Sequence, residues 1–163
     1  NAQGSTIGLS IVHDFDRLHR AVSEALDYDS EVLIENYIGG RELTVAILGD
    51  KPLPIVEIKP RSGFYDYRAK YTAGMTRYLA PAPISDALAA ECREIAMATF
   101  RALGCRGFGR IDLRVDAQDN IYVLELNTIP GFTETSLLPK AAACAGVDFS
   151  VLCDRIVRLA RYG

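Results

Sequence analysis

The chain has 163 residues, of which 49% are hydrophobic and 24% are charged, a composition typical of a soluble globular domain with one core. Its formal net charge of −3 and its pI near 5.4 give no electrostatic reason to expect a nucleic acid or an anionic membrane as a partner. No apolar run approaches the roughly 20 residues that a membrane-spanning helix needs, so we also expect no membrane insertion.

The first half of the chain alternates loops, one helix and several strand patterns. A loop at Gly4–Gly8 leads into a short predicted strand at 9–12, and Asp14 or Asp16 can then cap a helix with apolar residues at helical spacing. Three further strand patterns follow, divided by glycine-rich and proline-containing turns; they cover residues 31–37, 42–48 and 53–58. We expect these three strands to form an antiparallel meander.

The second half begins with a segment from Pro60 to Pro83 that lacks periodicity and is rich in tyrosine, an unusual length for a loop without a function. Ser85 then opens a predicted helix that Gly104 ends. A predicted β-hairpin follows, and after it come two helices, at 136–145 and from Phe149 onward. The pattern predicts an α+β fold, an antiparallel sheet flanked by helices.

The four cysteines form no C-x-x-C pair, and their spacing fits neither a zinc site nor a dense disulfide framework. Three of them, Cys92, Cys144 and Cys153, lie in helical patterns and are expected to be packing residues. We therefore predict a reducing, cytoplasmic location.

Four polar residues of the predicted hairpin share one face of the sheet. On the first strand Arg110 and Asp112 alternate with apolar residues, at the period-two spacing of β-structure. On the second strand the same alternation puts Glu125 and Asn127 on one face, together with Ile121 and Val123. A turn centred between residues 118 and 119 places Asp112 opposite Glu125 and Arg110 opposite Asn127, whereas a loop of odd length would shift these pairs to a diagonal.

Two carboxylates that face each other repel unless a cation lies between them. Magnesium takes a few carboxylate or amide oxygens and keeps its other positions for water and phosphates, so this set suits phosphoryl chemistry, with Arg110 beside it to hold negative charge. The alternative is a solvated hairpin face on which Arg110 and Arg114 pair with Asp112. The hairpin alone does not decide between the two.

Three other segments have both a functional and an ordinary interpretation. The small residues of Gly4–Gly8 can cradle phosphate oxygens or simply turn the chain, and the tyrosine-rich loop with Lys70 can close over an anion or tether itself to the core. Ser136 can cap the following helix or, together with the Leu137 amide, bind a carboxylate. The Gly131 amide, directly after the hairpin, can help to bind an oxyanion.

The order of these segments resembles a known family. The motifs that carry the resemblance are Gly4-Ser-Thr-Ile-Gly, Glu35-Asn-Tyr-Ile with Gly40-Arg-Glu-Leu-Thr-Val, Phe64-Tyr-Asp-Tyr-Arg-Ala-Lys-Tyr, Leu103-Gly-Cys-Arg-Gly-Phe-Gly-Arg-Ile-Asp and Leu124-Glu-Leu-Asn-Thr-Ile-Pro-Gly-Phe-Thr-Glu-Thr-Ser-Leu. Together they resemble the bacterial D-alanine–D-alanine ligases of the ATP-grasp superfamily, over essentially the whole chain. The resemblance implies an ATP-grasp fold.

The resemblance also implies a subdomain organisation. Residues 1–80 would be the remainder of the central ATP-grasp subdomain, with a lid loop at about 60–80, and residues 81–163 would be the C-terminal subdomain. The N-terminal domain of these enzymes does not precede Asn1. We therefore expect this chain by itself to be inactive.

The implied activity is the ATP-dependent joining of two D-alanines, through a D-alanyl phosphate, to D-alanyl-D-alanine for peptidoglycan precursors. Asp112, Glu125 and Asn127 would hold two magnesium ions, for which manganese can substitute. Arg110 and the Gly131 amide would stabilise the transferring phosphoryl group and the tetrahedral intermediate. These roles are what the resemblance implies for the hairpin and the loop after it.

The remaining ligand contacts are implied in the same way. ATP would be bound by residues from four segments: Gly4, Ser5 and Thr6 over its phosphates, Lys70 from the lid, the backbone of Glu35, Asn36, Tyr37 and Ile38 at adenine, and Glu42 at a ribose hydroxyl. The D-alanines would be bound by Ser5 with Tyr71 at the first, and by Ser136 with Leu137 at the carboxylate of the second.

Tyr71 also bears on specificity, because relatives that form the D-alanyl-D-lactate ester usually have phenylalanine there; Tyr71 therefore favours the dipeptide. The resemblance further implies a homodimer for the full-length protein. Two alternatives stay open: another ATP-grasp carboxylate–amine ligase with a different acceptor, and a non-catalytic nucleotide-binding fragment.

Overall fold

The structure is a computed structural model that describes residues 8–61 and 74–160. The chain divides into two compact units, which we describe separately. Unit 1 consists of Asn1–Ile38 with Pro60–Thr76, and unit 2 consists of Gly39–Lys59 with Arg77–Gly163. The predicted boundary between residues 80 and 81 stays a prediction, because compact units of a chain need not coincide with the subdomains of a larger protein.

Unit 1 contains a short 3₁₀ helix, η1 (Phe15–Arg17), that continues into α1 (Leu18–Leu26). The Asp14 carboxylate accepts a hydrogen bond of 3.1 Å from the Asp16 amide, so Asp14, one of the two predicted caps, begins this helical segment. The amphipathic pattern of 15–26 was therefore a sound guide to the helix.

The two strands predicted in unit 1, at 9–12 and 31–37, are wrong, since both segments form neither helix nor strand. Leu33 and Ile34 are 79% and 63% exposed. β-propensity largely reflects packing against neighbouring strands, and among the described residues these segments have no ladder partner. Their apolar composition alone does not make them strands.

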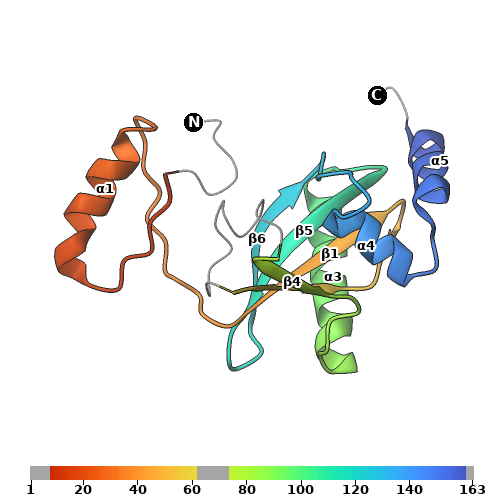
Figure 1. The fold of residues 1–163 in the computed structure, drawn as a ribbon, viewed down its shortest axis with the longest axis horizontal. Coiled ribbons are helices and arrows are strands. Elements are labelled where there is room, and N and C mark those ends of the chain that lie inside the picture. The colour runs from red at the N-terminus through yellow and green to blue at the C-terminus, as the bar shows by residue number, and fades with distance from the viewer. Residues whose placement is uncertain (1–7, 62–73, 161–163) are drawn as a thin grey trace. The chain divides into compact units, whose positions relative to one another are not determined.

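Unit 2 is built on an antiparallel sheet (Figure 1). Its strands are β1 (Arg41–Leu48), β2 (Lys51–Pro52), β3 (Val56–Pro60), β4 (Thr76–Leu79), β5 (Phe108–Val115) and β6 (Ile121–Asn127). Their order is β4-β3-β1-β5-β6, with β2 paired to β1. The pairs of β1 with β2, β3 and β5, and of β5 with β6, are antiparallel, which confirms the predicted antiparallel sheet.

One face of this sheet packs against α3 (Asp86–Ala102), which lies behind the sheet in Figure 1. Alternate residues of the two central strands point to this face. The core comprises Leu43, Val45 and Ile47 of β1, Ile111, Leu113 and Val115 of β5, and Leu88, Cys92, Ala96, Met97 and Phe100 of α3. The intervening residues of β1 and β5 therefore point to the opposite face, which carries the polar side chains.

Three helix signals in the sequence match the structure. Ser85 Oγ accepts from the Leu88 amide at 3.2 Å and caps α3, and Gly104, at φ +66°, follows its end. The last two helices are α4 (Leu137–Cys144) and α5 (Phe149–Leu159). Within residues 8–61 and 74–160, no helix combines the length and the apolar character needed to span a membrane. All four cysteines are free; Cys92 is buried, as expected of a packing residue, but Cys144 is exposed, so the packing prediction is wrong for Cys144.

Candidate active site

The polar face of the sheet is organised by the register of its three neighbouring strands. Asp112 of β5 is paired with Thr44 of β1 on one side and with Glu125 of β6 on the other. Arg110 is paired with Asn127. Directly paired residues of antiparallel strands project to the same face, so both pairs predicted from the sequence are confirmed.

A β-bulge produces this register. The connection from Val115 to Ile121 has five residues, an odd number, which by itself would have moved Glu125 out of line with Asp112. The ladder shifts by one residue between Leu113 and Asp112, where Leu124 is the extra residue on β6. The bulge thus restores the predicted pair.

The bulge also corrects one prediction about β6. A regular alternation would have put Ile121 and Val123 on the same face as Glu125. Instead Val123 is paired with Leu113, a core residue, and Ile121 packs against the α3 core. The strand changes face at Leu124, because a bulge inserts one residue into the alternation.

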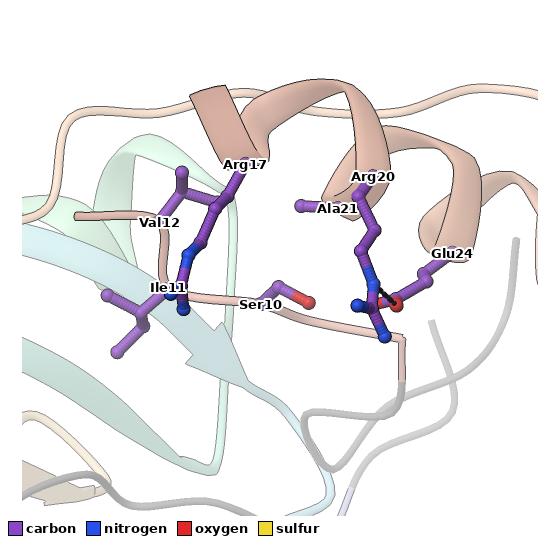
Figure 2. A pocket seen from close by; sticks show the side chains of 7 residues that line it. All are labelled: Ser10, Ile11, Val12, Arg17, Arg20, Ala21 and Glu24. Carbon is purple, nitrogen blue, oxygen red and sulfur yellow. Dashed lines mark hydrogen bonds and ion pairs between the residues drawn. The ribbon is translucent and has the colours of Figure 1, made fainter. Parts of the chain in front are cut away.

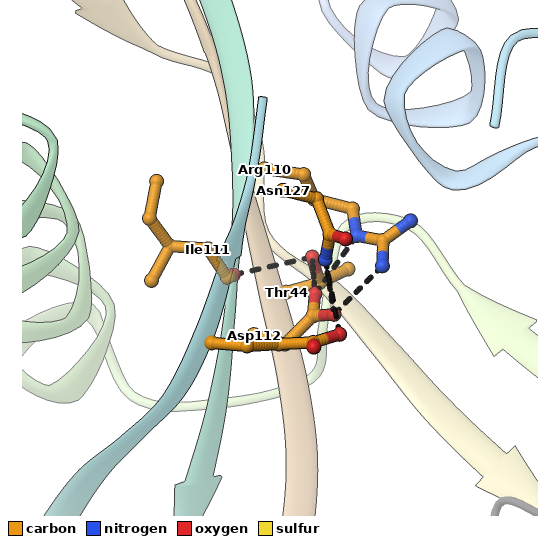
Figure 3. Close-up of polar contacts among 6 residues, drawn as sticks. Thr44, Arg110, Ile111, Asp112 and Asn127 are labelled. Carbon is orange, nitrogen blue, oxygen red and sulfur yellow. Dashed lines mark hydrogen bonds and ion pairs between the residues drawn. The ribbon is translucent and has the colours of Figure 1, made fainter. Parts of the chain in front are cut away.

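The Asp112 carboxylate lies at the centre of the polar face, and the residue as a whole is only 7% exposed (Figure 3). Arg110 donates to both of its oxygens, from Nε to Oδ1 at 2.9 Å and from Nη2 to Oδ2 at 2.7 Å. Thr44 Oγ1 donates to Oδ1 at 2.7 Å, and Asn127 Nδ2 contacts Oδ2 at 3.4 Å. Four donors from three strands therefore hold this one carboxylate.

The alternative interpretation, a solvated hairpin face, is only partly right. Arg110 does pair with Asp112, but Arg114 instead lies 3.5 Å from the carboxylate of Glu42 on β1. Asp112 and Arg114 are buried, whereas Glu125 on the hairpin's second strand is exposed. Buried charges need partners to offset the loss of hydration, so the charges around Asp112 and Arg114 are paired in a low-dielectric setting, while the Glu125 side of the face is open to solvent.

The donor set fits a magnesium ion. Asp112 and Glu125 supply carboxylate oxygens on facing positions, and Asn127 lies between them with its Nδ2 3.0 Å from Glu125 Oε1. Turning that amide over would present its Oδ1 to the same place. Among the described residues, no group of three or more His, Cys, Asp and Glu side chains could hold a metal ion. Magnesium does not need such a group, because it binds through one or two carboxylates and keeps water and phosphate as its other ligands.

The loop after β6 brings two further predicted residues together. A Cβ atom at Gly131 would lie 3.3 Å from Ser136 Oγ. Ser136 occupies the N-cap position of α4, but its hydroxyl accepts from the Thr133 amide at 3.0 Å and makes no capping bond. The first amides of α4, including that of Leu137, are therefore not capped by this side chain.

An aromatic cluster anchors the same loop. The ring of Phe132 lies 5.3 Å from that of Phe149 on α5 and 6.4 Å from that of Phe108 on β5, measured between centroids. Tilted aromatic pairs at these distances stabilise a loop through their large buried area. Phe132 thus ties the loop that contains Gly131 to β5 and to α5.

Known proteins with similar sequences identify the family of this chain. Residues 1–158 match the family model described as D-ala D-ala ligase C-terminus. The chain belongs to this family. It is 49% identical over 155 residues to the D-alanine–D-alanine ligase of Syntrophotalea carbinolica, with 95% of this chain and 50% of the relative covered. The corresponding enzyme of Methylacidiphilum infernorum is 46% identical, with 96% and 52% covered. The chain spans about half the length of the curated relatives that it matches.

Solved structures of the D-ala D-ala ligase family have the same fold. The D-alanine–D-alanine ligase of Bacillus anthracis superposes with a TM-score of 0.82 at 38% identity, and covers 98% of this chain and 52% of its own. A VanG D-Ala:D-Ser ligase from Enterococcus faecalis gives 0.82 at 35% identity, with 96% and 46% covered. These matches confirm the ATP-grasp fold expected from the sequence.

The other predicted site residues of this family member lie elsewhere or outside the described part. Glu35, Asn36, Tyr37 and Ile38 belong to unit 1, where they form no helix or strand and the Tyr37 ring lies edge-on to His13 at 6.2 Å. Gly4, Ser5, Thr6, Lys70 and Tyr71 fall outside the described residues. Their assigned roles stay predictions, as does the ribose contact of Glu42.

Unit 1 also has a hollow beside α1, which no predicted site residue lines (Figure 2). Ser10, Arg17 and Arg20 are among its lining residues, and Arg20 Nε is bound to Glu24 at 2.8 Å. That pair is exposed, so it contributes little to stability. The hollow gives no reason to move the candidate site of this ligase-family chain from the polar face of the sheet.

Sequence reasoning missed two residues of the site, Thr44 and Phe132. Thr44 stands in an apolar strand pattern and is separated from Asp112 by 68 positions, so only its β1–β5 pairing could have revealed it. Phe132 was visible within the loop motif, but its aromatic partners lie on β5 and α5. Local periodicity has no information about either contact.

Proposed function

We propose that the full-length protein containing this chain joins two D-alanines in an ATP-dependent reaction that supplies peptidoglycan precursors. The observation that carries the proposal is the facing of Asp112 and Glu125 across β5 and β6, with Arg110 and Asn127 beside them. It occurs in a chain of the D-ala D-ala ligase C-terminus family, whose relatives are named D-alanine–D-alanine ligase.

Asp112, Glu125 and Asn127 would hold two magnesium ions, or manganese ions in their place. When bound, such ions neutralise the charge of nucleotide phosphates and of the group being transferred. The fit rests on the oxygen-rich donor set and on the cross-strand position of the two carboxylates. A protein of this fold, the B. anthracis ligase, has been solved in complex with ATP, which supports ATP as the phosphoryl donor here.

Arg110 would stabilise the negative charge on the transferring phosphoryl group. Its guanidinium is held by two bonds to Asp112, with Nη2–Oδ2 at 2.7 Å, and its side chain is largely buried. A cation fixed in a low-dielectric setting needs little reorganisation when charge develops beside it. This fixed position supports a role in transition-state stabilisation rather than in loose substrate capture.

The loop after β6 would bind the substrates' oxygens. The Gly131 amide would stabilise the tetrahedral intermediate, and Ser136 with the Leu137 amide would take the carboxylate of the second D-alanine. The adjacency of Gly131 and Ser136 supports this arrangement, and helix N-terminal amides favour an anion. The Phe132 anchor would keep these amides in place.

The decisive experiment measures product formation by the full-length protein supplied with D-alanine, ATP and magnesium. We expect D-alanyl-D-alanine by mass spectrometry together with stoichiometric phosphate release. Glu125→Gln should lower the rate by about 100-fold or more, because it removes a charge from the cation site. Glu94→Gln, an exposed change on α3, should leave the rate unaltered. ATP binding without D-alanine-dependent phosphate release would refute the proposal and favour a non-catalytic nucleotide-binding role.

A second candidate is ligation of D-alanine to a different acceptor. It is favoured by one observation, the structural match to an enzyme named D-Ala:D-Ser ligase. Competition among D-alanine, D-serine and D-lactate in the same assay distinguishes the two candidates. If D-serine gives the main product, the ATP-grasp ligase assignment stands and the acceptor assignment changes.

The homodimer and the cytoplasmic location stay predictions. Size-exclusion chromatography of the full-length protein tests the first, and cell fractionation tests the second.

A further inference from the structure

Thr44 is a buried polar residue on β1 that touches the centre of the candidate site. Its side chain is fully enclosed, at 1% exposure, and its Oγ1 lies 2.7 Å from Asp112 Oδ1. We propose that Thr44 is a positioning residue, whose hydroxyl orients the Asp112 carboxylate for cation binding. The inference rests on the proposed function, since it takes Asp112 as a cation ligand.

The hydroxyl of Thr44 has one proton and two nearby acceptors. Asp112 Oδ1 is at 2.7 Å, whereas the backbone carbonyl of Ile111 is at 3.3 Å. Hydrogen bonds to an ionised acceptor are shorter and stronger than bonds between neutral groups. The shorter contact therefore takes the proton, and the threonine acts on the carboxylate rather than on the backbone.

The hydrogen bond from Thr44 restricts the orientation of the Asp112 carboxylate because Thr44 lies on a different strand. Arg110, the other strong donor to Asp112, lies two residues away on the same strand, but Thr44 comes from the neighbouring strand β1. Two donors from different strands restrict the rotation of a carboxylate more than one donor does. Thr44 and Arg110 Nε both bind Oδ1, whereas Oδ2 has Arg110 Nη2 and only a long contact of 3.4 Å from Asn127. Oδ2 is thus the oxygen that can most readily exchange a donor for a cation.

A purely structural role makes a different prediction. If Thr44 served only the β1–β5 packing, valine would replace it well, because valine has the same shape and suits a strand. If Thr44 orients Asp112, valine removes the donor and cation affinity falls, although the fold survives. Partners that orient metal ligands typically contribute 10–100-fold to affinity or activity. The two roles therefore separate on cation affinity rather than on stability.

The test uses the full-length protein and measures Mn²⁺ binding by electron paramagnetic resonance in the presence of a non-hydrolysable ATP analogue. We expect Thr44→Val and Thr44→Ala each to weaken Mn²⁺ binding by about 10-fold, with Thr44→Ser restoring affinity to within about threefold of wild type. Thr99→Val removes a comparable hydroxyl, bound at 2.9 Å to the Ile95 carbonyl in α3. It should leave Mn²⁺ affinity unaltered.

Thermal unfolding of each variant shows whether it is folded, and Asp112→Asn separates the two proposals. If Asp112→Asn abolishes Mn²⁺ binding while the folded Thr44→Val and Thr44→Ala proteins bind as wild type, the role of Thr44 is refuted and the cation site stands. If Asp112→Asn binds Mn²⁺ as wild type, the cation site itself is refuted, and the role of Thr44 with it.

Discussion

Breaking the ion pair between Arg41 and Glu57 should destabilise the sheet that carries the site. Glu57 is 2% exposed, and Arg41 donates to both of its oxygens, Nε to Oε1 and Nη2 to Oε2, each at 2.9 Å. Arg41 Nη2 also donates to the Pro83 carbonyl at 2.9 Å. These bonds tie β1, the strand of Glu42 and Thr44, to β3 and to the segment before α3.

Arg41→Met removes all three bonds and leaves the Glu57 carboxylate buried. Removal of one partner from a buried pair typically costs about 3–5 kcal/mol. Two features reduce this cost: the Arg41 side chain is 34% exposed, and Lys59 Nζ remains 3.6 Å from Glu57 Oε2. We therefore expect a loss of about 2–3 kcal/mol in the free energy of unfolding.

Urea unfolding of the chain measures this loss as a lower midpoint at an unchanged slope. Arg158→Met is the matched control, because it breaks the slightly shorter Arg158–Asp154 pair of 2.7 Å on an exposed surface. We expect this change to lower the free energy of unfolding by less than about 0.5 kcal/mol. The double change Arg41→Met with Glu57→Leu removes both charges and should recover most of the loss. Equal small effects of Arg41→Met and Arg158→Met would refute the reasoning from burial.

Three further predictions concern other parts of unit 2. Phe132→Ala should loosen the loop that holds Gly131, so that in the full-length protein the KM for D-alanine rises while the KM for ATP stays unchanged; parallel changes in both would contradict this. Burial raises the pKa of the Cys92 thiol from its ordinary value of 9.0 to about 11. The protonated thiol therefore contributes fully to the free energy of unfolding below pH 9.0, and this contribution is lost as the pH rises from 9.0 to about 11. Unfolding midpoints should fall over that window in wild type but less in Cys92→Ala, and an equal fall in both would exclude Cys92 as the cause. Gly40→Ala should cost about 2 kcal/mol or more, because φ is +109° and a Cβ atom would collide with the Val115 carbonyl oxygen; a midpoint within error of wild type would disprove the strain.

The alternation of residues in the hairpin predicted its cross-strand pairs but not its bulge. The alternation in β5 and the turn residues after it led to the correct pairing of Asp112 with Glu125. The reasoning was nevertheless incomplete. The connection between the two strands has five residues, an odd number, and the pairing is correct only because the bulge at Leu124 shifts the register by one residue. Bulges have only a weak local signature, so the change of face at Val123 could not be read from the alternation.

The wrong strands of unit 1 have a related cause. Residues 31–37 have the apolar, β-branched composition of a strand, yet they form no strand in the structure. A strand exists only with a partner that satisfies its backbone groups, and a single segment does not encode where that partner is. The helices were better predicted, because a helix satisfies its hydrogen bonds within one segment and its caps are local.

The sequence by itself determined the helices, the caps at Asp14 and Ser85, the two central strands, the family, and the four hairpin side chains that share one face. Each of these depends on residues close together in the chain or on a motif of fixed spacing. Only the tertiary structure decided that Thr44 donates to Asp112 across 68 positions, that Arg41 holds Glu57, and that Phe132 meets rings from β5 and α5. These contacts arise from strand order and helix packing, which depend on how the whole core closes and leave no periodic trace in the sequence.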